Sequence, residues 1–292
     1  MNHLFQLTGF AIVRVKKINP VNFRGKKIDP REISCSVNIQ PILVDAPIDL
    51  GRGLPIFSFS PDGSHPYVRA VLLALKKPHK ESAECIFKVL SKYYELVQPV
   101  NAASVLNLND KDVLEFDLRP SWSAIMPWEK RNLDEWSSAH WSSVLAENHL
   151  YKRNLTRNDG WAWVGPVSIK KLKVEVQRLD RIFHSILENN YNRNDGSDGD
   201  ILAEMLVNDS GEWCWQAISG QHRVSVLSGM GFNKVPIRIV KIIFRRDVEF
   251  WSQVRSKLYS KEVALKVFDN IFSGNTPEVA KNWEEHMRKG IL

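Results

Sequence analysis

The stretch Ser219-Gly220-Gln221-His222-Arg223 is the part of this chain from which the fold is best inferred. Apolar segments of strand length lie on both sides of it, and Asn208-Asp209-Ser210-Gly211 is a typical turn between two of them. Gly231 ends a short helix-like run that follows the stretch. The predicted order is strand, turn, strand, loop, helix and strand, over residues 201–207, 208–211, 213–218, 219–223, 224–230 and 235–240.

The loop has the residue types of an anion-binding site. Gly220 at the end of a strand lets the backbone turn tightly and approach a ligand closely. The helix that follows directs free N–H groups and the positive end of its dipole at the loop, which favours phosphate. His222 and Arg223 add side-chain donors, and arginine can bind a phosphate through two parallel hydrogen bonds. We expect Ser219–Arg223 to bind a phosphate-bearing ligand. The alternative is a plain strand-to-helix turn with polar residues on its surface.

This segment resembles the ParB/sulfiredoxin-like superfamily, whose signature is a strand that ends in a Gly-X-His-Arg or Gly-Glu-Arg-Arg loop. Residues 178–190 are similar to the first helix of that family, and Asn190 stands where the family usually has glycine. Both residues tolerate the left-handed conformation that ends a helix. The likeness covers roughly 168–240. It implies an α+β protein with a mixed, β-rich N-terminal region, a ParB/sulfiredoxin-like domain and a C-terminal helical extension, over residues 1–160, 161–244 and 245–292.

The family contains several activities, and residue 221 separates two of them. In sulfiredoxin a catalytic cysteine lies between the glycine and the histidine of the loop, whereas this chain has Gln221 there. A carboxamide is not a nucleophile, and Cys214 belongs to the preceding strand. We therefore do not expect sulfiredoxin chemistry. In the related partition proteins the loop helps to bind a nucleoside triphosphate.

The small-molecule kinases of the superfamily give the leading functional expectation. They use a loop similar to Gly-His-His-Arg for phosphates, and a glutamate near the first helix as general base; Glu175 is the equivalent here. The resemblance implies a nucleotide-dependent phosphotransferase for a small hydroxylated substrate, with Glu175 and His222 as catalytic residues. It also implies that Ser219, Gly220, Gln221, His222 and Arg223 bind ATP, ADP or CTP with Mg²⁺. Alternatively, Glu175 is an exposed helix residue that pairs with Lys171 or Arg178.

Two other functions remain open from the sequence. The chain has 40 Lys and Arg against 33 Asp and Glu, a formal charge of +7, which favours anionic partners and makes a nucleic-acid-binding or nuclease-like protein the second hypothesis. A catalytically silent regulator that binds a nucleotide is the third. No helix-turn-helix pattern follows the loop, which argues against DNA partition. The sequence has no phosphate loop of the Gly-x4-Gly-Lys-Ser/Thr type, no dinucleotide fingerprint and no nucleophile elbow.

Composition narrows the class of protein further. At 292 residues and 43% hydrophobic content the chain can bury a large core. Its three cysteines, Cys35, Cys85 and Cys214, are widely spaced, which indicates a reducing compartment and no structural zinc site. The N-terminus does not resemble a secretory signal, because Arg14 interrupts its apolar run, and Ala70–Leu75 is too short to span a bilayer. We expect a cytoplasmic protein with no metal site and no membrane span.

The remaining pattern is less specific. We expect strands at 10–15, 33–39, 42–44 and 113–118, a helical region from Pro66 to about Val97 with a break at Pro78, loops and short helices at 119–164, a helix capped by Ser168, and a helix from Ser260 to Gly274. His65 either lines a cleft or belongs to a plain turn, and His140 and His149 are equally ambiguous. The tryptophans are either core residues or a platform for a sugar or base; the polar-flanked ones are Trp122, Trp128, Trp161 and Trp163.

Overall fold

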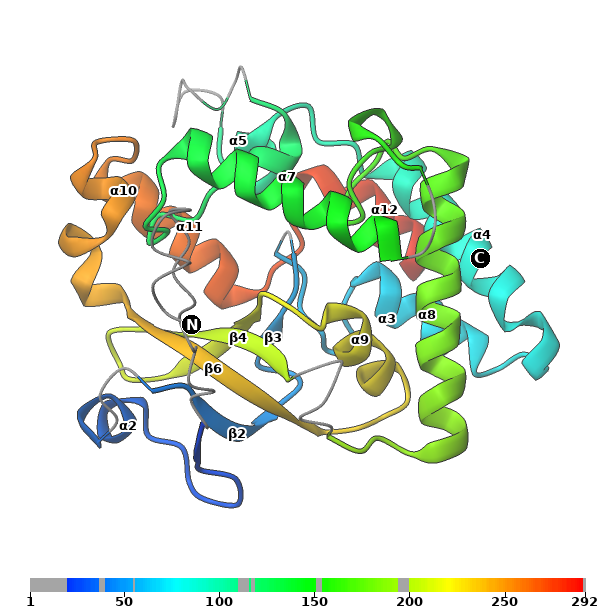
Figure 1. Cartoon of the computed structure of the whole chain (residues 1–292), viewed down its shortest axis with the longest axis horizontal. Coiled ribbons are helices and arrows are strands. Elements are labelled where there is room, and N and C mark those ends of the chain that lie inside the picture. The colour runs from blue at the N-terminus through cyan, green and yellow to red at the C-terminus, as the bar shows by residue number, and fades with distance from the viewer. Residues whose placement is uncertain are drawn as a thin grey trace, which may run out of the picture.

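The computed structural model describes residues 20–36, 40–54, 56–109, 116, 119–150, 154–193 and 200–290. These residues form a mixed α+β fold around one six-stranded sheet (Figure 1). The strand order is β1-β2-β6-β4-β5-β3. The strands are β1 (Val21–Asn22), β2 (Ile42–Pro47), β3 (Gly51–Arg52), β4 (Ile201–Val207), β5 (Trp213–Ala217) and β6 (Lys234–Phe244).

Strands from the N-terminal part of the sequence lie at both edges of this sheet. β2 pairs antiparallel with β6, from Ile42 opposite Ile239 to Pro47 opposite Lys234. β6 runs parallel to β4, β4 antiparallel to β5, and β3 parallel to β5. The strands of the first 60 residues therefore flank the later strands on both sides. The boundary near residue 160 remains a prediction, but the sheet is continuous across it.

Helices cover both faces of the sheet (Figure 1). On one face, α3 packs against α4 and α9, and α8 packs against the same two helices. On the other face, the α10–α11 region and Trp128 cover β4 and β6, because the Trp128 indole donates to Glu204 and contacts Trp251 and Phe268. The α-helices are α2 (Pro30–Ser36), α3 (Pro66–Ala74), α4 (Ser82–Leu96), α5 (Ala102–Val105), α7 (Leu133–Leu150), α8 (Ile169–Asn189), α9 (Gln221–Gly229), α10 (Ser252–Arg255), α11 (Lys261–Ser273) and α12 (Lys281–Arg288).

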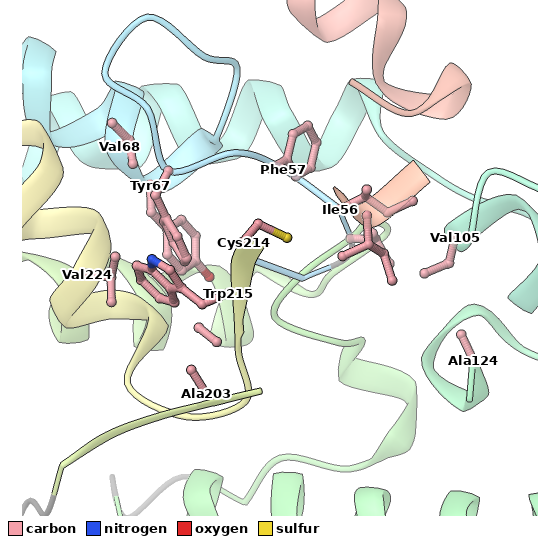
Figure 2. Close-up of a cluster of buried hydrophobic side chains, with 14 of the residues drawn as sticks. Ile56, Phe57, Tyr67, Val68, Val105, Ala124, Ala203, Cys214, Trp215 and Val224 are labelled. Carbon is pink, nitrogen blue, oxygen red and sulfur yellow. The ribbon is translucent and has the colours of Figure 1, made fainter. Parts of the chain in front are cut away.

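The core lies between the sheet and α3, α8 and α9, and it is rich in aromatic residues. Tyr67, Trp215 and Val224 lie together between α9, α3 and β5, and each is completely buried (Figure 2). Trp215 also stacks on Phe59, and its indole N–H donates to the carbonyl of Pro47 at 2.8 Å. Apolar burial of this extent is the main favourable term in folding.

Most of the elements expected around the loop are confirmed. β4, β5, α9 and β6 follow in the predicted order, and α9 begins at Gln221. Ser168 caps α8 by accepting the Lys171 N–H at 3.1 Å, and Ser260 caps α11 in the same way. The helical region near Pro66 consists of α3 and α4, with a break that includes Pro78. The strand at 42–44 is part of β2.

Two expectations were wrong. Residues 33–36, expected as part of a strand, belong to α2, because Asp29 accepts the N–H groups of Arg31 and Glu32 and Pro30 occupies the first turn. The tryptophan-rich region contains α7, an 18-residue helix, rather than only loops and short helices. The Asn132 side chain accepts from the backbone at the start of α7 while Glu135 reaches back to the Asn132 N–H, a capping box.

Some expectations fall outside the described residues. These are the strand at 10–15 and, apart from Phe116, the strand at 113–118. Across the described part of the chain, no helix is both long and apolar enough to cross a membrane.

Candidate functional site

Gly220 forms the turn between β5 and α9. Its φ of 81° is left-handed, a conformation that costs other residues energy. A Cβ at this position would lie 2.9 Å from Cγ1 and 3.2 Å from Cα of Ile201, so a side chain would press on the start of β4. No side chain caps α9 at Gly220. The N–H groups of the first turn and the positive end of the helix dipole are therefore available to an anion at this loop.

His222, in the first turn of α9, is directed into the protein. Its side chain is almost completely buried, and Nε2 lies 2.8 Å from Oε2 of Glu175 in α8. Burial and the nearby charge of Arg178 lower the pKa of His222 to about 4. The ring is thus neutral at pH 7, Nε2–H donates to the carboxylate, and Nδ1 carries the lone pair.

Glu175 is the centre of a buried polar cluster. Its carboxylate is completely buried, with Lys171 Nζ at 2.8 Å and Arg178 Nη1 at 3.3 Å. The Tyr67 hydroxyl oxygen lies 3.4 Å from Oε2. Burial raises the pKa of Glu175, but the hydrogen bond from His222 and the charge of Lys171 outweigh it and bring the pKa to about 2. Glu175 is therefore ionised, and both of its oxygens already accept hydrogen bonds.

The cluster extends to two further elements. Lys171 Nζ donates to Oδ1 of Asn148 in α7 at 2.7 Å, and Asn148 is buried. The hydroxyl groups of Tyr67 and Tyr94 are 3.0 Å apart, and both donate to the carbonyl of Ala162. Side chains of α8, α3 and α9 thus contact the Glu175 carboxylate, while Asn148 and the Ala162 carbonyl hold Lys171 and Tyr67 in place. The expectation that Glu175 is an exposed helix residue is wrong, although its pairing with Lys171 and Arg178 is present.

Gln221 and His65 tie the loop to the N-terminal part of the chain. Gln221 Oε1 accepts the Leu54 N–H at 2.8 Å, just after β3. His65 is completely buried, stacks on Phe59, and has no hydrogen-bond partner on either ring nitrogen among the described residues. A Cβ on Gly53 would lie 2.7 Å from His65 Nε2 and 3.1 Å from Gln221 Oε1, so this packing requires glycine. His65 therefore belongs to the core rather than to an open cleft.

Ser219 and Arg223 lie on the solvent side of the loop. Ser219 is exposed, and its N–H donates to the carbonyl of Leu202 at 3.2 Å. Arg223 is half-buried, and its Nη2 would be 3.3 Å from a Cβ on Gly220. It also hydrogen-bonds to Tyr191, just after α8. The structure thus brings all five predicted loop residues and Glu175 together, with His222 and Glu175 below the loop and Arg223 above it.

Sequence reasoning missed a second group of charges beside Tyr191. Arg193 pairs with Asp200 at 2.7 Å, and Arg238 lies 3.9 Å from the same carboxylate. Asp200 immediately precedes β4, whose first residue contacts Gly220. In the sequence these three residues are 7 and 38 positions apart and match no motif, so only the pairing of β4 with β6 places them together.

Of the aromatic residues proposed as a platform, Trp163 lies at the site. Its ring centroid is 5.5 Å from that of His222 and 5.3 Å from that of Tyr67, and it is partly exposed. Trp128 and Trp161 are buried, and Trp122 packs on Trp141. Trp128 and Trp161 are core residues, and Trp122 is partly buried and packs against the core.

The other proposed histidines lie in α7, away from the loop. His140 stacks on Trp136, and burial lowers its pKa to about 4. His149 is exposed near the end of the helix.

Cys214 is buried in β5, where burial raises the pKa of its thiol to about 12. A thiol of this pKa is not a nucleophile at neutral pH. Among the described residues no group of three or more His, Cys, Asp or Glu side chains could hold a metal ion. Comparisons with protein-family models, curated proteins and solved structures gave no match.

Proposed function

We propose that this chain is a member of the ParB/sulfiredoxin-like superfamily that binds the phosphates of a nucleotide at the Gly220 loop. The observation that carries the proposal is the left-handed Gly220 at the uncapped N-terminus of α9, with Arg223 over it. Backbone N–H groups, the helix dipole and a guanidinium then act on the same anion. The order strand, turn, strand, glycine loop, helix and strand within one sheet supports membership of the family.

The charge below the loop also favours an anion. Lys171 and Arg178 carry two positive charges against the one negative charge of Glu175, and His222 is neutral at pH 7. The cluster therefore has a net positive charge in a buried region, where electrostatic interactions are stronger than in water. Trp163, partly exposed beside His222, is the surface on which a base or sugar would stack.

We further propose that the protein is a phosphotransferase for a small hydroxylated substrate, with roles that differ from the sequence expectation. Glu175, with both oxygens occupied and a pKa of about 2, is poorly suited to act as general base. His222 takes the proton of the substrate hydroxyl at Nδ1, while its Nε2–H keeps donating a hydrogen bond to the Glu175 carboxylate. The carboxylate thereby positions the ring and stabilises the imidazolium that forms. A bound phosphate beside the ring raises the pKa of His222 toward the working range.

Mg²⁺ would arrive with the nucleotide phosphates, which supply oxygen ligands for it. The described residues offer no cluster of carboxylates for this ion, so no step in the proposal depends on protein ligands to Mg²⁺.

Nucleotide binding is tested by thermal unfolding with ATP, ADP, CTP and GTP, each with Mg²⁺. A ligand at 100 times its Kd stabilises the protein by about 2.7 kcal/mol. Arg223→Ala should weaken binding by roughly 10- to 100-fold, because a charged hydrogen bond contributes about 1.5–3 kcal/mol. Arg288→Ala, on the exposed surface of α12, is the control and should bind normally. Equal affinity of both variants would show that the loop is not the phosphate site.

The phosphotransferase proposal has its own measurement. His222→Asn should leave nucleotide affinity within a few fold and lower phosphoryl transfer by about 10²–10⁴, the usual share of a general base. If transfer persists in this variant, His222 does not accept the proton.

Nucleic-acid binding is the second candidate, favoured by the formal charge of +7 and by the arginines near Asp200. Binding of duplex or single-stranded DNA would weaken steeply with salt, since each neutralised phosphate releases counterions. Salt-insensitive nucleotide binding without DNA binding would exclude this function.

A further inference from the structure

Lys171 is a buried cation in a position that does not favour the helix that carries it. Its side chain is almost completely buried in the first turn of α8. The positive end of the helix dipole repels a cation there, and burial of a charged amine costs free energy unless the group is paired. Neither helix formation nor apolar burial explains a lysine at this position, so its contacts must.

The contacts of Lys171 connect α7 with the carboxylate of Glu175. Nζ donates to Oδ1 of Asn148 at 2.7 Å and to Oε1 of Glu175 at 2.8 Å. Asn148 is buried as well. The ammonium group therefore has a fixed place between an amide of one helix and a carboxylate of another.

The two oxygens of Glu175 have different partners. Lys171 contacts Oε1, whereas Nε2 of His222 lies 2.8 Å from Oε2. Nη1 of Arg178 lies 3.3 Å from each oxygen, so it does not distinguish between them. Lys171 thus fixes the rotation of the carboxylate, and this rotation decides where Oε2 meets the ring of His222.

We propose that Lys171 is a positioning residue for His222, which acts through the Glu175 carboxylate and is itself held by Asn148. This rests on the proposed function, in which His222 accepts the proton of the substrate hydroxyl. By fixing Oε2, Lys171 keeps the Nε2–H of His222 on the carboxylate and leaves Nδ1 as the base. Its charge opposes that of the imidazolium, so Nδ1 gives the proton to water readily after phosphoryl transfer.

The charged and titratable groups that face His222 come from α8, from α3 and from the residue before α3. They are Lys171, Glu175, Arg178, Tyr67 and His65. Burial lowers the pKa of His222 most, and the charge of Arg178 lowers it further. Glu175 raises this pKa, and the charge of Lys171 lowers it. Lys171 and His222 contact opposite oxygens of one carboxylate, so their charges are roughly 6 Å apart, where a like charge lowers a pKa by about one unit or more.

An NMR titration of the His222 imidazole in the full chain tests the proposal without any ligand. The signal is assigned by its absence from His222→Asn, and in the unmodified chain it titrates with a pKa of about 4. In Lys171→Met the pKa should rise to about 5 or above, because the opposing charge is gone while Arg178 still pairs with Glu175. Lys173→Met, at an exposed position of the same helix, is the matched control and should keep the pKa of the unmodified chain.

Asn148→Asp is a second variant, which also serves if Lys171→Met does not fold. Aspartate has the shape of asparagine and adds a negative charge beside Lys171, so the pKa of His222 should rise, by less than in Lys171→Met. A pKa of His222 that stays at the value of the unmodified chain in either folded variant would overturn the proposal.

The pH profile of phosphoryl transfer separates this proposal from the proposed function. The acidic limb of kcat/KM reports the free enzyme, so in Lys171→Met it should move upward by the amount that the NMR titration gives. A loss of packing alone would lower kcat/KM without moving the limb. Absence of transfer by the unmodified chain would refute the proposed function, whatever the titration shows. Transfer with an acidic limb that does not move in Lys171→Met would refute the role of Lys171 alone.

Discussion

The buried carboxylate of Glu175 makes a large and specific prediction for stability. Glu175→Gln keeps the shape of the side chain but leaves the charges of Lys171 and Arg178 facing a neutral amide in a buried site. Breaking a buried ion pair by removing one partner costs about 3–5 kcal/mol. The depressed pKa gives a similar magnitude: a fall from 4.5 to about 2 corresponds to about 3 kcal/mol.

Urea unfolding at pH 7 measures this loss, and two variants serve as controls. Glu84 forms an i,i+4 ion pair with Lys88 at 2.7 Å, almost the distance between Glu175 and Lys171, but this pair lies on the surface. The urea midpoint of Glu84→Gln should therefore not change measurably. Adding Lys171→Met to Glu175→Gln removes the unpaired cation and should recover at least about 1 kcal/mol. If Glu175→Gln unfolds at the same urea concentration as the unmodified chain, the carboxylate is not an ionised, buried group.

The sign of the pH dependence follows from the same value. The folded-state pKa of Glu175 is depressed, so its contribution is complete above about pH 4.5 and is lost as the pH falls toward 2. In Glu175→Gln this part of the acid transition should be absent.

Two further predictions concern the surroundings of the loop. Gly220→Ala should lower the free energy of unfolding by about 1–3 kcal/mol, because of its left-handed φ and its contact with Ile201. Gly231 has a similar φ of 84° but open space around it, so Gly231→Ala should lower the free energy of unfolding only by the backbone part, about 1 kcal/mol. Equal losses of the two variants in urea unfolding would contradict the contact with Ile201. His65→Phe should remove an acid-sensitive part of the stability profile. Burial lowers the pKa of His65 to about 3, so the folded protein with neutral His65 has its full stability above pH 6.5. The free energy of unfolding then falls by about 2 kcal/mol between pH 7 and pH 5, because the unfolded chain binds a proton that the folded protein does not. The exposed His149→Phe should keep the original pH profile, and an unchanged profile in His65→Phe would refute the assignment.

The elements around the loop could be predicted because their signals are local. Turn residues at 208–211, Gly220 and Gly231 divide the segment into pieces of strand and helix length, and Ser168 and Ser260 cap the helices that they precede. The two wrong predictions, the strand at 33–36 and the absence of a long helix in the tryptophan-rich region, followed the apolar pattern and overlooked local helix-start signals. Asp29-Pro30 starts α2, and Asn132 with Glu135 starts α7.

The interior of the site could not be predicted, because it depends on contacts between distant residues. Glu175 and His222 are 47 positions apart, and Gln221 reaches Leu54 over 167 positions. A glutamate flanked by Lys171 and Arg178 in a helix has the pattern of a solvated face, and its burial follows only from α7, α3 and α9 packing around it. The sequence therefore shows which side chains lie at the loop, but it does not show the protonation states of Glu175 and His222 or the residues that contact them.

The position of early strands on both sides of the late strands has a consequence for folding during synthesis on the ribosome. β2 is made about 190 residues before the strand with which it pairs. At about 5–20 residues per second, its apolar residues wait roughly 10–40 s for β6. β3 waits almost as long for β5. The nascent chain thus carries β2 without β6 and β3 without β5 for most of translation, and closing loops of this length makes the final step slow. The apolar residues of β2 are therefore exposed to aggregation during synthesis, before the chain is released from the ribosome.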